Sequence, residues 1–247
     1  MKALESLHAT LDPAGLHTLQ VISKAGHFNR WMFETIRPYL KGDILEIGSG
    51  IGNISDFLVN EGYTVTLSDY NQEYCDVLKE KYHGRKNVKD ILSIDLQQPD
   101  FYLKYNHLKE TFDTIYLLNV IEHLQDDHKA VEYCKYLLKP KGNLILLAPA
   151  FGFLYCRLDK ELGHFRRYRL KELRDLLVHQ NFTVIHQQYY NLLGLFGWFV
   201  SGKLAGSKTL DASETSLFNK LVPLAKLSDR LVFRKVGLSA IIAGEKK

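Results

Sequence analysis

The segment LGHFRRYRLKEL gathers side chains that could act on a proton or an anion. His164 carries an imidazole, whose ring nitrogen can accept a proton, so it could serve as a general base. Arg166 and Arg167 present planar guanidinium groups that pair with carboxylates or phosphates, and Tyr168 could line the same pocket. The alternative is that the segment only begins a basic helix at the surface. Its arginines would then contact solvent, and its aromatic side chains would pack in the core. We favour a functional role for these four residues and a solvated helix from Arg169 onward.

A second group with acid–base potential lies in the segment NVIEHLQDD, which contains Glu122 and His123. A carboxylate beside an imidazole can move a proton, or the two can hold a divalent cation. The alternative is that these residues only begin and pack the helix that follows. We predict no metal here, while Glu122 and His123 join His164 as catalytic candidates.

The strongest signal is the turn in ILEIGSGIGN, where glycines directly follow a strand pattern and open a helix. Gly48, Gly50 and Gly52 allow a sharp turn and a close approach of the backbone to a ligand. Asn53 stands where a nicotinamide-binding G-x-G-x-x-G turn has its third glycine, which argues against an oxidoreductase. Glu46, just before the turn, disfavours a pyrophosphate and suits a cationic ligand.

Strand and helix patterns alternate around this turn. Strands are expected at 43–48, 63–69, 88–95, 112–120 and 143–149, and helices at 53–62 (with Asn53 as its cap), 71–84 and 126–142. The alternation predicts a Rossmann-like, doubly wound, mostly parallel sheet. Such sheets bind ligands beyond the carboxyl ends of their strands. Asp69 and Asp95 end the second and third strands there, and an acid in the position of Asp69 suits ribose hydroxyls.

The composition indicates a folded cytoplasmic protein with a mild preference for anionic partners. Hydrophobic residues make up 46%, and the net charge of +4 suits an anionic substrate or a membrane surface. Nucleic acid is not expected as a partner, because no dense basic stripe is present. The three cysteines are expected to be reduced, buried thiols. A signal peptide is not expected, and the apolar segment 191–200 is too short to span a bilayer.

Together these pieces resemble a class I S-adenosylmethionine-dependent methyltransferase of the type 11/12-like subgroup, which acts on small molecules. The matching segments are LEIGSGIGN, LSDY, SIDL, FDTIYLLNVIEHLQD and LLKPKGNLILLAP. The resemblance implies S-adenosylmethionine as cofactor and S-adenosylhomocysteine as product. It places Glu46 near the cofactor's ammonium, Asp69 at the ribose and Asp95 at the adenine. The full cofactor set implied in this way is Glu46, Gly48, Ser49, Gly50, Gly52, Asp69, Tyr70, Asp95, Leu96 and Asn119.

Transfer of a methyl group to a hydroxyl needs a base or a metal, whereas an amine needs only a free lone pair. NVIEHLQDD resembles the E-x-x-E-H segment of ubiquinone-pathway and small-RNA 2′-O-methyltransferases, whose acids and histidine hold a divalent cation; Asn119 replaces the first acid here. GHFRRY, followed by a helix and YYNLLGLFGW, resembles a bacterial and archaeal subgroup found beside cell-surface biosynthesis enzymes. His164 is therefore expected to face the methyl group. The predicted substrate contacts are Arg166, Arg167, Tyr168 and Trp31.

The chain is predicted to form a single methyltransferase domain with seven strands, the last of them antiparallel. Its parts are a helical lead or lid at 1–40, a cofactor-binding core at 41–190, a helical insertion at 191–236 and a last strand at 237–247. The core ends with a helix and a strand, and the segment from Phe151 to Gly163 is expected to be irregular.

The lead and the insertion each leave alternatives open. Phe28, Arg30 and Trp31 of the lead could contact the cofactor as a lid, or their helix could simply pack on the sheet. The insertion has seven basic and three acidic residues beside an apolar helical pattern. It could contact a membrane surface, cover the substrate or form a dimer interface, so a monomer and a homodimer both stay open.

The predicted function is methyl transfer from S-adenosylmethionine to an oxygen or nitrogen of a small, anionic or amphipathic metabolite. The alternatives are an RNA methyltransferase and a catalytically silent cofactor-binding protein. Against the first, the chain has no appended RNA-binding module. Against the second, the glycine turn and Asp69 are intact. The predicted location is cytoplasmic, with surface association to a membrane left open.

Overall fold

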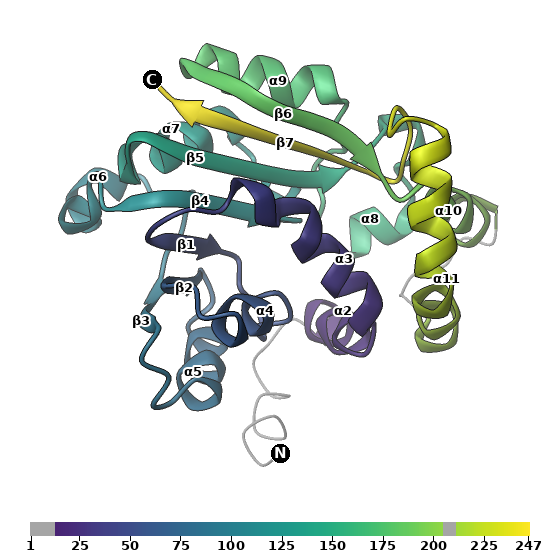
Figure 1. Cartoon of the computed structure of the whole chain (residues 1–247), viewed down its shortest axis with the longest axis horizontal. Helices are drawn as coiled ribbons and strands as arrows, with labels where there is room; N and C mark the ends of the chain where they lie inside the picture. Colours follow the sequence, from purple (N-terminus) through teal and green to yellow (C-terminus); the bar gives the residue numbers. More distant parts are fainter. Residues whose placement is uncertain (1–12, 205–210) are drawn as a thin grey trace.

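A seven-stranded sheet forms the centre of the molecule (Figure 1). The computed structural model describes residues 13–204 and 211–247. The predictions for 1–12, among them the expectation of no signal peptide, and those for 205–210 lie outside the described residues. The strands are β1 (Ile44–Ile47), β2 (Val65–Asp69), β3 (Val88–Ser93), β4 (Phe112–Leu118), β5 (Leu138–Pro149), β6 (Phe182–Tyr190) and β7 (Ser239–Lys246).

The strand order is β3-β2-β1-β4-β5-β7-β6, with β1 parallel to both β2 and β4. β7 runs antiparallel between β5 and β6, so the predicted mostly parallel sheet with an antiparallel last strand is confirmed. Every residue of β1 and β2 is buried, because helices cover both faces of the sheet. The order reverses between β1 and β4, and ligands bind beyond the carboxyl ends of strands at such a switch point.

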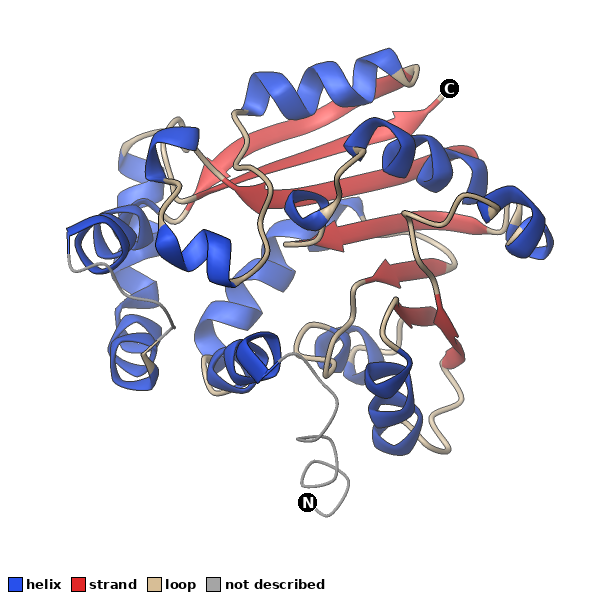
Figure 2. Ribbon diagram, turned by 180° about the vertical axis from the view of Figure 1, so that it is seen from behind, coloured by secondary structure: helices blue, strands red, loops and turns tan. Residues whose placement is uncertain are grey.

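Helices lie on both faces of this sheet (Figures 1 and 2). One face packs against α3 (Gly26–Ile36), α4 (Ser55–Asn60), α5 (Gln72–Lys81) and α11 (Ala212–Leu231). The other packs against α6 (Phe101–Lys104), α7 (Asp127–Leu137) and α9 (Leu170–His179). The remaining helical segments in the described ranges are α2 (Pro13–Ser23), α8 (Arg157–Glu161), α10 (Leu192–Trp198), the π-helical η6 (Phe199–Leu204) and the 3-10 turns η2 (Arg37–Tyr39), η3 (Asn106–Leu108), η4 (Ile121–His123) and η5 (Gly152–Leu154). In that part of the chain no helix is long and apolar enough to cross a bilayer.

The start of α4 differs from the prediction. The expected cap, Asn53, donates its side-chain N–H to the carbonyl oxygen of Leu19 at 3.0 Å, and Ile54 occupies the cap position instead. The asparagine is therefore used to attach α2 to the glycine turn. A local sequence pattern could not show this, because the acceptor lies 34 residues away.

The segment after β5 is more regular than expected. It contains η5 and the five-residue helix α8, although the sequence favours an irregular path as far as Gly163. The carboxylate of Asp159 accepts the backbone N–H of Cys156 at 2.9 Å and so stabilises the first turn of α8. A helix of this length is too short to display a helical repeat of apolar residues, which explains the missed prediction.

Candidate active site

The glycine turn lies between the ends of β1 and β4. Gly48 has φ of +79°, a conformation that favours glycine. A Cβ atom added there would come within 2.3 Å of the Cγ2 atom of Val120, the residue that precedes η4. The turn therefore packs directly against the segment that carries Glu122 and His123.

Two buried acids hold the turn in place. The carboxylate of Asp69 accepts hydrogen bonds from the backbone N–H groups of Gly50 at 2.9 Å and Asn71 at 3.0 Å. Glu46 accepts a hydrogen bond from the Ser55 hydroxyl at 2.5 Å, and burial raises the pKa of Glu46 to about 7. Both acids thus connect the end of a strand with the first residues of the turn and α4.

The other predicted cofactor residues lie at the same edge of the sheet. Ser49 is buried beside β2, where its hydroxyl oxygen accepts the backbone N–H of Ser68 at 3.2 Å, and Tyr70 is exposed. Asp95 is half-buried after β3 and accepts the backbone N–H of Gln97 at 2.8 Å.

Two further members of the cofactor set follow the ends of β3 and β4. Leu96 is buried in the apolar core. Asn119 is exposed directly after β4 and has φ of +55°. The set is thus collected along one edge of the sheet, where parallel strands present their carboxyl ends.

A helix that the sequence does not single out covers the turn. The Leu19 side chain of α2 lies 3.0 Å from the position that a Cβ atom on Gly50 would take. Leu16 of α2 belongs to a small apolar cluster with Tyr74, and Ile51 of the turn packs against it. The lead therefore reaches the turn through α2.

The predicted lid residues of α3 lie elsewhere. Trp31 packs at 4.9 Å, edge to face, on Tyr190, and Phe28 stacks on the same ring at 6.3 Å. Arg30 pairs with Glu61 at 2.7 Å. These contacts correspond to the alternative of a helix packed on the sheet, which the sequence leaves open beside that of a lid.

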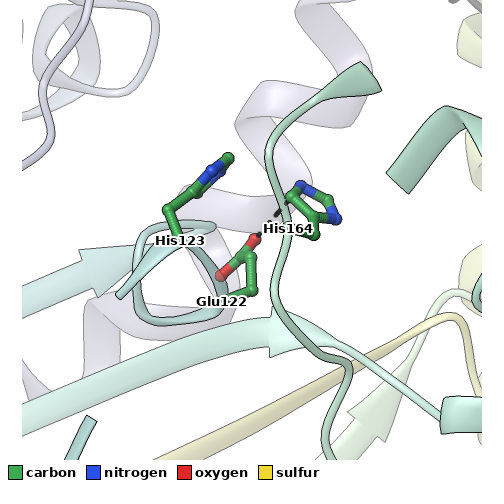
Figure 3. A group of neighbouring side chains, drawn as sticks. All are labelled: Glu122, His123 and His164. Carbon is green, nitrogen blue, oxygen red and sulfur yellow. Dashed lines mark ion pairs between the residues drawn. The ribbon is translucent and has the colours of Figure 1, made fainter. Parts of the chain in front are cut away.

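The two catalytic predictions converge in one cluster. Glu122, His123 and His164 each offer a potential ligand atom, and these atoms all lie within 4.8 Å of one another (Figure 3). The first two come from η4 after β4, and His164 comes from the loop after α8. The backbone N–H of Phe165 donates to the carbonyl oxygen of Glu122 at 2.8 Å, which joins the two segments.

Burial controls the charges in this cluster. Glu122 is fully buried, and neither of its carboxyl oxygens has a hydrogen-bond partner among residues 13–204 and 211–247. Burial raises the pKa of Glu122 to about 8. Burial and the nearby His164 lower the pKa of His123 to about 4. The cluster therefore favours a neutral carboxyl and a neutral His123 imidazole near pH 7.

His164 sits between two acids. Its Nδ1 atom lies 2.9 Å from Oδ1 of Asp159, and its Nε2 atom lies 4.0 Å from Oε1 of Glu122. Only 9% of the His164 side chain is exposed. Asp159 is absent from the sequence-based candidates, because nothing local to α8 links it to a histidine.

The two arginines that were predicted to contact the substrate pair with acidic side chains of the protein itself. Arg166 pairs with Asp127 at 3.0 Å, and Arg167, with 1% of its side chain exposed, pairs with Asp159 at 2.8 Å. Tyr168 is buried and donates its hydroxyl to Asp127 at 2.8 Å. Arg167 and Tyr168 thus face the interior instead of an open pocket. By contrast, Arg169, Lys171 and Arg174 are exposed, as expected for the solvated face of α9.

A family model of a methyltransferase domain matches residues 45–146. A solved S-adenosylmethionine-dependent methyltransferase from Archaeoglobus fulgidus superposes with a TM-score of 0.58 at 15% identity, covering 88% of this chain and 94% of that one. Phosphoethanolamine N-methyltransferase 2 from Haemonchus contortus, bound to S-adenosyl-L-methionine, gives a TM-score of 0.58 at 18% identity over 89% of this chain and 52% of that one. Residues 45–146 thus match a methyltransferase domain, and the fold is that of solved S-adenosylmethionine-dependent methyltransferases, as the sequence predicts.

Among curated proteins, the chain is similar to ubiquinone biosynthesis O-methyltransferases. The one from Haemophilus ducreyi is 33% identical over 107 residues, which cover 42% of this chain and 43% of that protein. The one from Colwellia psychrerythraea is 27% identical over 188 residues, which cover 76% of this chain and 69% of that protein. The chain thus spans less than half the length of the Haemophilus relative.

Proposed function

We propose that this chain transfers a methyl group from S-adenosylmethionine to a hydroxyl oxygen of a small acceptor. The observation that carries the proposal is the meeting of Glu122, His123 and His164 beside the glycine turn. A hydroxyl must lose its proton when it is methylated, whereas a neutral amine already offers a lone pair. A shielded base is therefore more useful for an oxygen acceptor. The O-methyltransferase names of the two relatives agree with this choice.

The residues around the turn fit this cofactor. Bound S-adenosylmethionine supplies an electrophilic methyl group on a sulfonium centre. Asp69 would hold the ribose hydroxyls, because two backbone N–H groups already fix its carboxylate at the end of β2. Glu46 would serve the ammonium group, since a nearby cation favours the ionised form of a buried carboxyl. Asp95 and Asn119 complete the same edge at the ends of β3 and β4.

The chain's own residues would handle the proton. His164 accepts it at Nε2, because Nδ1 is engaged by Asp159. Glu122 has no hydrogen-bond partner among the described residues and could therefore orient the acceptor oxygen. The burial of both groups keeps water away, which strengthens their electrostatic interactions with the acceptor. Positioning and a shielded base together account for the proposed chemistry.

The same cluster fits a divalent cation as an alternative aid to the reaction. Two imidazoles and one carboxylate form a donor set that suits zinc, iron or manganese. His123 is neutral at physiological pH because its pKa is lowered to about 4, and a histidine must be neutral to bind a metal ion. The three side chains would hold the ion, whose contribution is a lowered pKa of a bound hydroxyl. This would change how the acceptor is activated but not which group is transferred.

A substrate screen tests the proposal. The purified chain is incubated with methyl-labelled S-adenosylmethionine and a panel of phenols, hydroxy acids, sugars and amines, each with and without a chelator. We expect label on a hydroxyl acceptor, and much less label with His164→Ala. Labelling confined to amines would contradict the oxygen acceptor. Chelator sensitivity that added manganese or zinc reverses would assign the cluster to a cation, and chelator resistance would assign His164 as the base.

We also propose that the insertion contacts an anionic membrane surface. One face of α11 carries exposed leucines spaced three or four residues apart, and its other side buries Val222 and Ala225 against the sheet. The exposed leucines, called here the leucine stripe, are Leu217, Leu221, Leu224, Leu227 and Leu231. Basic residues accompany the stripe at Lys220, Arg230 and Lys235. An apolar stripe with a basic border is complementary to anionic lipid headgroups.

Vesicle sedimentation tests this contact. The chain should sediment with vesicles that contain phosphatidylglycerol and much less with pure phosphatidylcholine. Replacing Leu217, Leu224 and Leu231 by serine should abolish sedimentation, whereas Leu103→Ser, at a still more exposed leucine on α6, should not. No sedimentation of the intact chain would contradict the membrane proposal. A dimer that the triple replacement dissociates would assign the stripe to a second copy of the chain instead.

A further inference from the structure

The proposed base is held by a buried ion pair that begins in α8. The Asp159 side chain has no exposed surface. Its Oδ1 atom lies 2.9 Å from Nδ1 of His164 and accepts the Nε–H of Arg167 at 2.8 Å. Its Oδ2 atom accepts the backbone N–H of Cys156 at 2.9 Å. Donors from three residues thus fix both oxygens of one carboxylate.

We infer that Asp159 is a positioning residue that sets the tautomer and the ring orientation of His164. A carboxylate can only accept hydrogen bonds, so Nδ1 of His164 must carry the proton and Nε2 keeps its lone pair. Figure 3 shows His164 beside Glu122, and Nε2 is the atom that faces the Glu122 carboxyl at 4.0 Å. The inference rests on the proposed function only in one respect, namely that the lone pair on Nε2 takes the proton of the acceptor hydroxyl.

Arg167 stabilises the same oxygen atom of Asp159 that His164 contacts. Burial of Asp159 opposes its ionisation, but the hydrogen bond with His164 and the charge of Arg167 keep its pKa below the ordinary value. Arg167 also donates to the carbonyl oxygen of Ala150 at 3.3 Å. The guanidinium lies 4.5 Å from the ring centre of Trp198, which belongs to α10. Contacts therefore run without interruption from the insertion through Arg167 and Asp159 to His164.

The competing explanation is that Asp159 only stabilises α8. That role uses Oδ2 and the Cys156 N–H, whereas Oδ1 serves His164 and Arg167. Asp159→Asn disturbs this arrangement without changing the size of the side chain, because a single amide oxygen cannot satisfy donors on both sides. Whichever way the amide turns, its NH2 group meets at least one N–H donor. The replacement keeps the size of the side chain while removing its charge and one acceptor atom.

The direct test is the protonation state of the two His164 ring nitrogens, read by ¹⁵N–¹H multiple-bond correlation spectroscopy. In the wild-type chain we expect the neutral ring to carry its proton on Nδ1. In Asp159→Asn we expect that preference to be lost, and in Glu161→Gln, an exposed replacement on the same helix, we expect it to be kept. A wild-type ring protonated on Nε2, or an Asp159→Asn variant with the wild-type pattern, would overturn the inference.

Kinetics give the second readout. With an acceptor found by the screen, Asp159→Asn should lower kcat by about 10- to 100-fold, the range for metal-binding imidazoles that lose an orienting partner, with KM values within about twofold. A fall in activity that follows only from a smaller folded fraction would indicate a structural role. Should Asp159→Asn fail to fold, Asp159→Glu makes the same test, since it keeps the charge but displaces the carboxylate from Nδ1 of His164. If the tautomer is as expected but no acceptor is methylated, the proposed function fails and the positioning role stands.

Discussion

Glu122→Gln should change how the stability of the protein depends on pH. Glu122 is fully buried, and burial raises its pKa from 4.5 to about 8. Between these two values the folded state binds a proton that the unfolded state does not, so the free energy of unfolding falls as pH rises. Glutamine has similar size and no charge, so it removes this dependence.

The magnitude follows from the separation of the two pKa values. One pKa unit corresponds to about 1.4 kcal/mol, so the interval from 4.5 to about 8 corresponds to about 5 kcal/mol. The Glu122→Gln variant and the wild type should therefore be similarly stable below pH 4.5. The variant should then gain by up to about 1.4 kcal/mol per pH unit and level off near 5 kcal/mol above pH 8. This is a large part of the total stability of an ordinary domain.

Urea unfolding from pH 4.5 to pH 9 measures this difference. Glu46, whose pKa burial raises to about 7, contributes to the pH dependence of both proteins and so cancels in the comparison. Glu80→Gln, at an exposed glutamate on α5, serves as the control and should follow the wild type at every pH. A constant difference between the Glu122→Gln variant and the wild type across this range would refute the argument, because Glu122 would then ionise as it does in water.

Three further predictions concern the glycine turn and its surroundings. Gly48→Ala should lower the free energy of unfolding by about 1–3 kcal/mol in urea unfolding, because its positive φ and the nearby Val120 methyl both oppose a Cβ atom; an unchanged midpoint would count against the described turn. Asp69→Asn should weaken S-adenosylmethionine binding by about 10- to 100-fold in calorimetry, because a charged acceptor is lost, whereas equal affinity would remove Asp69 from the cofactor set. Leu19→Ala on α2 should weaken the same binding more than Arg30→Ala on α3, because α2 packs on the turn, and the reverse order would favour α3 as the lid.

Much of the fold could be predicted because its signals are local. Buried parallel strands are rich in apolar and β-branched residues, and β1 and β2 are buried along their full length. Gly48 and its neighbours mark a turn that few other residues could form. The ends of the strands then predict the edge of the sheet to which Asp69 and Asp95 belong.

The sequence could not predict that Glu122, His123 and His164 lie together in one cluster. Glu122 and His164 are 42 positions apart, and a backbone hydrogen bond between η4 and the loop after α8 brings them together. Asp159 could not be recognised from the sequence as part of this cluster, because α8 is too short to show a periodic pattern of apolar residues. The lead raises a similar difficulty: both α2 and α3 have apolar residues, and only tertiary packing decides that Leu19 covers the turn while Trp31 packs elsewhere.

The most direct test of the account compares methyl transfer and cofactor binding in the wild type and in His164→Ala. Calorimetry gives the affinity for S-adenosylmethionine, and rapid-quench assays with labelled donor and an identified hydroxyl acceptor give the rate of a single turnover. The account predicts a rate lower by about 100- to 10,000-fold, the range for loss of a general base, with cofactor affinity within about twofold. An unchanged rate, or a loss of binding as large as the loss of rate, would contradict it.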